Sequence, residues 1–247
     1  MDLKVLTLNC WGLPVVAKNR KQRIEAIAET IADSHYDVVC LQEVWLDKDF
    51  TFIKEKVKSS LPFSHYFYSG VTGSGVCVLS KYQIQEAFFH RWPVNGYIHK
   101  IQHGDWFGGK GVGLCCLKVK EFKINIYSAH LHAEYNRNCD EYQAHRVLQA
   151  YDTAQFIQLT SGSCNLVVLA GDLNTEPEDL AYRILLNISG CKDSYVEVKS
   201  ENGPGFGTNE TCENSYTPKS LVKKGYQGKR IDYIMYRANE NTNLFRS

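Results

Sequence analysis

The chain has 247 residues, with 28 Lys and Arg against 27 Asp and Glu, and its formal net charge is +1. A hydrophobic fraction of 44% and a charged fraction of 22% are typical of a folded globular protein and exclude a disordered or fibrous chain. The balanced charge argues against a surface that coats nucleic acid, since such surfaces carry an excess of Lys and Arg. We expect one domain, residues 1–247, whose core is large enough to fold without disulfides or structural metals.

Nine cysteines are an odd number, and most of them, such as Cys40 and Cys115, lie inside apolar runs. No CxxC pair is present, so zinc binding is not expected, and buried free thiols in a reducing compartment are the better interpretation. Asp2 and Lys4 interrupt the first apolar run, which argues against a signal peptide. No stretch reaches the ~20 apolar residues of a membrane span, so we expect a soluble, cytosolic chain.

Short apolar runs alternate with helical patterns along the chain. Runs of strand length predict strands at 4–9, 37–43, 124–130, 165–172 and 230–236, with several antiparallel strands between 63 and 119. Apolar spacings of three and four predict a helix at Ile24, Ile27, Ala28 and Ile31, a second at Ile53, Val57 and Leu61, and a third, of about five turns, at Ala144, Val147, Leu148 and Tyr151. Thr175–Glu178 has the pattern of a helix capping box. Strands covered on both faces, with helices between them, favour an α/β layered sandwich.

Polar residues stand where otherwise apolar strands end. Four such positions are Asn9, Glu43, His130 and Asp172, and three further candidates are His132, Asn174 and Asp232. Any one of them would usually just begin a solvated loop, but four strand ends together indicate a common site at one edge of a sheet. Carboxylate and amide oxygens with few thiols suit a hard cation such as Mg²⁺.

Two other segments have competing interpretations. The glycine-rich stretch 108–113 lacks the spacing of a nucleotide P-loop, so ATP binding is not expected. Aromatic residues gather at 88–92, at Tyr97 and at 105–107. They either pack in a β-rich layer, or some of them, Trp106 among them, face a lipid interface or a choline group.

Five motifs in order along the chain carry a family resemblance: Thr7–Pro14, Leu41–Trp45, Ser128–Tyr135, Gly171–Pro177 and Lys229–Ile234. They resemble the motifs of the endonuclease/exonuclease/phosphatase superfamily and, within it, of neutral sphingomyelinases. The resemblance implies a four-layer α/β/β/α sandwich of two mixed sheets, similar to deoxyribonuclease I, and the last strand of the family pattern has no counterpart before Ser247.

The resemblance also implies roles for individual residues. Glu43, with Asn9 beside it, would hold Mg²⁺, or Mn²⁺ in its place. Asp172 and Asn174 would orient the attacking water or the substrate, and His130 would donate to a phosphoryl oxygen as the alkoxide leaves. Substrate contacts are also implied for His132 and Lys110. The reaction implied is hydrolysis of sphingomyelin, or of a related choline phospholipid, to ceramide and phosphocholine at the cytoplasmic face of a membrane. For Asp232, a structural ion pair with Arg230 is as good an interpretation as a functional role.

One departure from the family pattern concerns the general base. In the superfamily a Ser-Asp-His triplet follows the Arg230–Tyr233 strand, whereas no His follows His145 in this sequence. We therefore expect the 247-residue chain, if it is the whole protein, to be nearly inactive, since a positioned base is worth ~10²–10⁴ in rate. Two alternatives stay open: a nuclease of the same superfamily, and a catalytically incomplete homologue that binds phospholipids. We expect neither a nucleic-acid partner nor an obligate protein partner.

Overall fold

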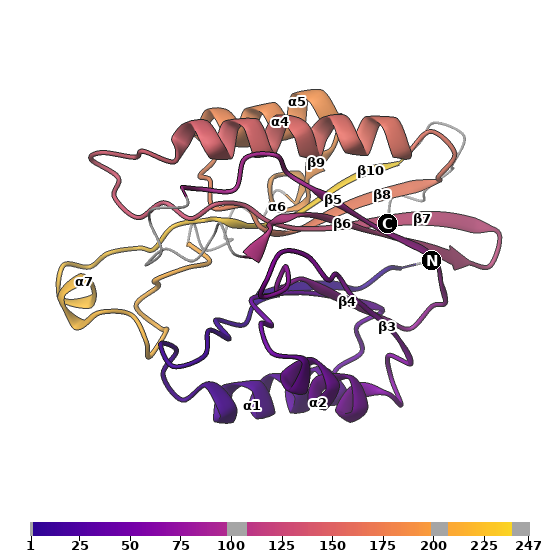
Figure 1. The fold of residues 1–247 in the computed structure, drawn as a ribbon, viewed down its shortest axis with the longest axis horizontal. Coiled ribbons are helices and arrows are strands. Elements are labelled where there is room, and N and C mark those ends of the chain that lie inside the picture. The colour runs from indigo at the N-terminus through magenta and orange to yellow at the C-terminus, as the bar shows by residue number, and fades with distance from the viewer. Residues whose placement is uncertain (1, 98–107, 199–206, 239–247) are drawn as a thin grey trace.

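Two β-sheets lie face to face, and helices cover the outer face of each (Figure 1). This computed structural model describes residues 2–97, 108–198 and 207–238. The layers follow the order helix, sheet, sheet, helix, so the predicted four-layer α/β/β/α sandwich is confirmed. The strands predicted at 4–9, 37–43, 124–130, 165–172 and 230–236 are all present, each shifted by no more than two residues at either end.

The four-stranded sheet has the order β1-β2-β4-β3, and β1 and β2 are parallel. Its strands are β1 (Val5–Asn9), β2 (Val38–Gln42), β3 (Phe63–Tyr66) and β4 (Cys77–Ser80). Helices α1 (Arg20–Asp33) and α2 (Asp47–Val57) cover it. The predicted apolar stripe of α1 is confirmed, because Ile24, Ala28 and Ile31 are all buried against this sheet.

The six-stranded sheet has the order β5-β6-β7-β8-β10-β9, and only β7 and β8 are parallel among its described pairs. Its strands are β5 (Ile84–Arg91), β6 (Gly111–Val119), β7 (Phe122–His130), β8 (Leu166–Asp172), β9 (Lys192–Asp193) and β10 (Asp232–Ala238). Helices α4 (Gln143–Thr160) and α5 (Leu180–Ser189) cover it. The short helix α6 (Ser194–Glu197) lies against β9 and β10, and the short helix α7 (Lys219–Lys223) projects beyond the layers.

The space between the two sheets is filled by apolar side chains and thiols. Cys40 of β2 and Cys115 of β6 belong to this inner core, together with Phe67 and Val168. Seven of the nine cysteines are buried, as predicted, and none of the nine forms a disulfide. Burial raises the pKa of Cys40 to about 12, so this side chain stays a neutral thiol that packs as a small apolar group.

Two details of the predicted helices are wrong. Helix α4 has the expected length, but Leu148 and Tyr151 are half exposed, while Arg146 and Gln149 are buried. Gln149 faces inward because its amide accepts from the His132 backbone N–H at 2.9 Å and donates to the Val94 carbonyl at 2.9 Å. Hydrogen-bonded polar groups thus take positions where the periodicity predicted apolar ones.

The predicted capping box at Thr175 does not begin a helix. Helix α5 starts five residues later, after Asp179. The Asp179 carboxylate instead accepts from the Glu176 backbone N–H at 2.8 Å and from the Thr175 hydroxyl at 3.3 Å, which closes a turn before the helix. Local hydrogen bonds of this kind compete with helix formation.

The aromatic segment divides into two parts. Trp92 is almost completely buried and donates to Thr153 at 3.1 Å, so packing is its role, whereas Trp106 lies outside the described residues. Within the ranges given above, no helix combines the length and the apolar character that crossing a bilayer requires.

Candidate active site

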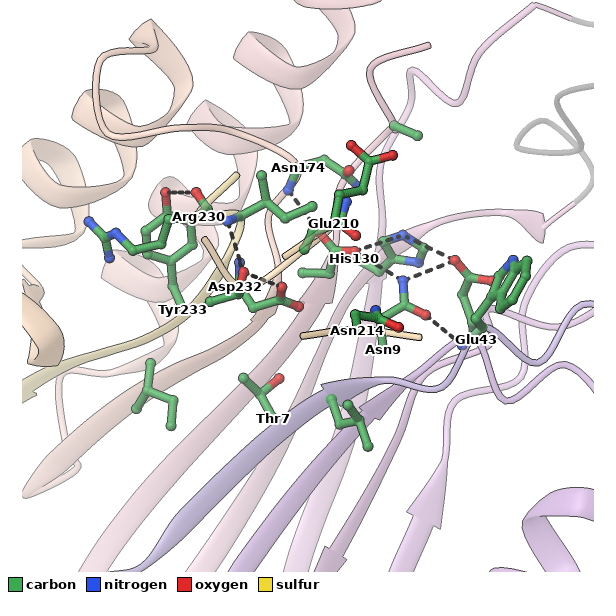
Figure 2. A pocket seen from close by; sticks show the side chains of 18 of the residues that line it. Thr7, Asn9, Glu43, His130, Asn174, Glu210, Asn214, Arg230, Asp232 and Tyr233 are labelled. Carbon is green, nitrogen blue, oxygen red and sulfur yellow. Dashed lines mark hydrogen bonds and ion pairs between the residues drawn. The ribbon is translucent and has the colours of Figure 1, made fainter. Parts of the chain in front are cut away.

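Polar side chains from both sheets meet at one end of the sandwich (Figure 2). Asn9, His130 and Asp172 are the last residues of β1, β7 and β8, and Asp232 is the first residue of the antiparallel strand β10. His130 is paired in register with Asp172, which is paired with Asp232 on its other side. Because residues opposite one another on adjacent strands point to the same face, these three side chains form a row along one edge.

Asn9 links the two sheets at this edge. Its Nδ2 donates to Glu43 Oε1 at 2.9 Å and to Asp172 Oδ2 at 3.0 Å (Figure 2). Its Oδ1 accepts from the Trp11 backbone N–H at 2.9 Å. The amide therefore holds two carboxylates near each other, and its oxygen is oriented by the backbone of the following loop.

The backbone is strained at three positions around the row. Trp11, Glu43 and Asn174 have φ angles of 44°, 56° and 45°, in the left-handed region that side chains rarely adopt. The turn at Glu43 is packed against the β1–α1 loop, where a Cβ on Gly12 would lie 2.2 Å from the Glu43 carbonyl oxygen. Such strain costs about 1–3 kcal/mol per residue and concentrates at sites where side-chain placement matters.

Two carboxyl groups in the row have raised pKa values. Burial, followed by the nearby charge of Asp232, raises the pKa of Asp172 to about 8, although hydrogen bonds from Asn9 and the Asn174 backbone N–H oppose the change. Burial also raises the pKa of Asp232, against a hydrogen bond of 2.6 Å from the Thr208 hydroxyl. Burial is thus the main cause of both shifts, and a neighbouring negative charge adds to it at Asp172.

His130 lies between the two groups of carboxylates. Its Nε2 is 4.0 Å from Glu43 Oε1 and 3.9 Å from Asp172 Oδ2. The buried Lys110 ammonium approaches the same nitrogen at 3.5 Å and donates to the Leu131 carbonyl at 3.0 Å. The imidazole thus faces the centre of the site with its Nε2 atom, the geometry that proton transfer to or from a bound ligand requires.

These residues open into a cavity of about 790 Å³. One wall carries Arg230, which pairs with Asp193 at 2.7 Å and lies 4.6 Å from the Tyr233 ring and 5.1 Å from the Tyr195 ring. Trp11, Tyr216, Thr217 and Pro218 also line the cavity. The cavity is lined by the acidic residues Glu43, Asp172, Asp193, Glu210 and Asp232. It is therefore rich in carboxyl groups and bounded by aromatic rings.

The donor set fits a hard divalent cation. Glu43 accepts from neutral donors on both of its oxygens, Asn9 at 2.9 Å and Trp45 at 3.4 Å. Within the described part of the chain, no Lys or Arg forms an ion pair with Glu43, Asp172 or Asp232. In the same ranges, no three His, Cys, Asp or Glu side chains are close enough to form a complete ligand set. The site therefore suits a hard divalent cation that is bound by one or two carboxylates and retains several waters.

The structure separates the remaining candidates. Asn174 joins the row, since its Nδ2 donates to the Leu131 carbonyl at 3.0 Å and the residue lines the cavity. His132 does not: it is fully buried, lies 3.8 Å from the Tyr142 ring in a stacked arrangement and is not part of the cavity wall. Lys110 is also absent from the wall, and its ammonium group lies 3.5 Å from His130 Nε2. Among the described residues, His132 and Lys110 therefore do not line this cavity, and the substrate contacts implied for them stay predictions.

Of the two interpretations of Asp232, the structural ion pair with Arg230 is wrong. Arg230 precedes β10 and pairs with Asp193 at 2.7 Å, whereas Asp232 accepts from the Thr208 hydroxyl and lies in the row with Asp172.

Sequence reasoning missed three residues of the site. Trp45 lies within the Leu41–Trp45 motif, and this motif could have identified it. Gly108 leaves room for the Trp45 ring, since a Cβ on Gly108 would lie 3.1 Å from that ring. Thr208 and Tyr216 carried no signal, because only tertiary structure brings residues 208–218 against β10 and the β1–α1 loop.

Comparisons with known proteins agree with this geometry. A Drosophila melanogaster protein provisionally named a neutral sphingomyelinase is 49% identical over 243 residues, which are 98% of this chain and 54% of that protein. Human sphingomyelin phosphodiesterase 2 is 42% identical over 238 residues, 96% of this chain and 56% of that protein. This chain thus spans about half the length of these relatives.

The fold is shared with a bacterial toxin. The structure of a Staphylococcus aureus beta toxin mutant with bound magnesium ions superposes with a TM-score of 0.75 at 17% identity, over 100% of this chain and 87% of that chain. The profile of the Endonuclease/Exonuclease/phosphatase family matches residues 6–243. The strand-end row, the shared sandwich and the matched residues lead to one conclusion: this chain belongs to the endonuclease/exonuclease/phosphatase family.

Proposed function

We propose that the chain is a Mg²⁺-dependent phosphodiesterase that hydrolyses sphingomyelin to ceramide and phosphocholine. The observation that carries this proposal is the row of His130, Asp172 and Asp232 facing Glu43, with Asn9 bridging the two sides. The identity of 42% to human sphingomyelin phosphodiesterase 2 supports the choice of substrate.

In the proposed reaction, each residue of the site has a separate role. Glu43 would hold the cation, with Asn9 and Trp45 orienting its two carboxylate oxygens. When bound, Mg²⁺ supplies a Lewis acid that neutralises charge on the phosphodiester; Mn²⁺ would supply the same chemistry. Asp172 and Asn174 orient the water or the substrate, and His130 Nε2 donates a proton to the departing ceramide oxygen.

The charge of the cavity favours a choline lipid over a nucleic acid. Among the described residues, five acidic side chains and one Arg line the cavity, and that Arg is already paired with Asp193. A polynucleotide would bring further phosphates past these carboxylates, whereas a phosphocholine headgroup has one phosphate and a quaternary ammonium. Acidic and aromatic walls attract such an ammonium group.

The test measures phosphocholine release from sphingomyelin with Mg²⁺, with Mn²⁺ and with chelator, together with nicking of a supercoiled plasmid. We expect release that requires a divalent cation and falls at least ~10²-fold in Glu43→Ala, with no nicking. Asp37→Ala is a matched control, because Asp37 is an acidic residue at the start of β2, near the opposite end of the strand. Nicking without phosphocholine release would establish the nuclease instead. Mg²⁺-dependent binding without either reaction would establish the catalytically incomplete homologue.

The expectation of slow turnover stays a prediction. It concerns this 247-residue polypeptide, in which no His follows His145. The measurement is kcat for this polypeptide against the same polypeptide joined to a following segment that contains Ser-Asp-His, with an increase of ~10²–10⁴ expected.

A further inference from the structure

Two segments beside the cavity carry exposed apolar and basic side chains without any carboxylate. One is the loop and first turn Leu13–Lys21 between β1 and α1, and the other is Lys219–Lys224 at α7. We call them together the mouth surface. Figure 1 shows α7 projecting beyond the layers at the end of the sandwich where β1 leads into α1.

The apolar part of the mouth surface is unusually exposed. Leu13, Val15 and Val16 are exposed to 37%, 104% and 69%, and Val222 to 40%. Val15 also has a φ of 70°, an uncommon conformation for a β-branched residue. Four consecutive exposed apolar residues, Leu13–Val16, are unfavourable in water and indicate a surface that contacts an apolar environment.

The basic part consists of five exposed lysines. They are Lys18, Lys21, Lys219, Lys223 and Lys224. Among them, Lys21 lies 3.8 Å from Glu25 within α1, and Glu213 is the one acidic residue in the sequence between Thr211 and Lys229. Since the whole chain has a net charge of only +1, this concentration of positive charge is local.

The two segments are joined into one surface. The Tyr216 hydroxyl accepts from Asn19 Nδ2 at 3.2 Å, and the Tyr216 ring lies 5.7 Å from the Trp11 ring. The Arg23 guanidinium lies 4.8 Å from the Trp11 ring and 5.5 Å from the Tyr216 ring, and it donates to the Cys10 and Trp11 carbonyls at 2.6 and 2.8 Å. Trp11 and Tyr216 also line the cavity, so the mouth surface is continuous with the site.

We propose that the mouth surface docks the chain on a bilayer that contains anionic phospholipid. Leu13–Val16 enter the boundary between headgroups and acyl chains, and the lysines contact lipid phosphates. The choice of a bilayer rests on the proposed function, because a membrane-resident substrate reaches the cavity only from a bilayer. It also rests on charge, because positive charge beside exposed apolar residues complements an anionic membrane. Docking here brings the cavity, and not the helical layers, to the lipid.

The test is co-sedimentation with vesicles of phosphatidylcholine and sphingomyelin, with and without phosphatidylserine. Lys223→Glu/Lys224→Glu should weaken binding to phosphatidylserine vesicles roughly 30-fold, since each basic residue near an anionic membrane contributes about fivefold. Val15→Asn/Val16→Ser should weaken it about 10-fold. Raising the salt concentration should weaken vesicle binding by the parent chain more than vesicle binding by the lysine variant.

Matched controls lie at the other end of the sandwich. Lys118→Glu/Lys120→Glu changes two exposed lysines at the turn between β6 and β7, and Leu159→Ser changes a side chain that is 82% exposed near the end of α4. Both controls should bind vesicles within about twofold of the parent chain. All four variants should hydrolyse a water-soluble, short-chain sphingomyelin at the parent rate.

The outcomes separate the two proposals. Three results would overturn the docking proposal: equal vesicle binding by all variants, equal loss of binding in the controls, or vesicle binding that does not depend on phosphatidylserine. The last of these results points to an acidic protein as the occupant. Binding that follows the expected pattern without hydrolysis of any sphingomyelin supports docking and overturns the proposed function.

Discussion

The four-stranded sheet brings Asn9 and Glu43 to the cavity, whereas the six-stranded sheet brings His130, Asp172 and Asp232. On the first side, Glu43 is surrounded by neutral donors, Asn9 and Trp45. On the second side, burial raises the pKa of Asp172 and of Asp232, and the charge of Asp232 adds to the shift at Asp172. In the function proposed above, the first side would hold the cation, while the second side would transfer protons and bind the substrate.

The largest effect should come from the histidine of the six-stranded side. His130→Ala removes the imidazole that faces both carboxylates, and we expect kcat to fall ~10²–10⁴-fold while the Mg²⁺ concentration for half-maximal activity changes little. Steady-state kinetics over a range of Mg²⁺ concentrations measure both quantities.

His132→Ala is the matched control, since His132 is two residues away but stacked on Tyr142 outside the cavity. It should lower the unfolding midpoint by about 5 °C and leave kcat within a few-fold of the parent value. If His132→Ala lowered kcat as much as His130→Ala does, our separation of the two histidines would be wrong.

An intermediate effect should appear in the pH dependence of stability. The pKa of Asp172 is raised to about 8 in the fold from the ordinary value of 3.8, so the folded state favours the protonated carboxyl. Its contribution to stability is therefore complete below pH ~4 and is lost as the pH rises through 8. In metal-free protein at pH 8, Asp172→Asn should raise the unfolding midpoint by about 5 °C, and at pH 4 it should have little effect.

Calorimetry in chelator at several pH values measures this difference. Mg²⁺ should raise the midpoint of the parent chain at pH 8 more than that of Asp172→Asn, because the cation stabilises the ionised carboxylate. A midpoint that is equal in both proteins across this pH range would contradict the assignment of negative-charge crowding to the six-stranded side.

The smallest effect should come from the four-stranded side. Trp45→Phe keeps a ring beside Gly108 but removes the donor that lies 3.4 Å from Glu43 Oε2, and we expect the affinity for Mg²⁺ to fall about threefold. Titration of activity with Mg²⁺ measures this change. Trp92→Phe, which removes the hydrogen bond to Thr153 in the core, should change stability and leave Mg²⁺ affinity unaltered.

Much of the fold could be predicted from the sequence. Doubly covered strands such as β2 and β8 are recognisable as unbroken apolar runs, because burial on both faces leaves no room for alternation. The face of α4 could not be predicted, since buried Gln149 owes its position to the backbone groups of Val94 and His132, which are distant in sequence, and buried Arg146 pairs with Asp140 in the loop before the helix. The start of α5 was also missed, because Asp179 competes for the backbone groups of the expected capping box.

The sequence by itself determined which residues end the strands, and therefore that Asn9, Glu43, His130 and Asp172 could meet at one edge. Each of the pairs β1/β2 and β7/β8 has a helical pattern between its strands, a connection typical of parallel strands, and the C-terminal ends of parallel neighbours meet at one edge of a sheet. Tertiary structure alone decided that His132 is buried, that Asp232 joins the row and that Tyr216 lies against Trp11. Register between distant strands and contacts between loops depend on packing of the whole chain, which no local pattern encodes.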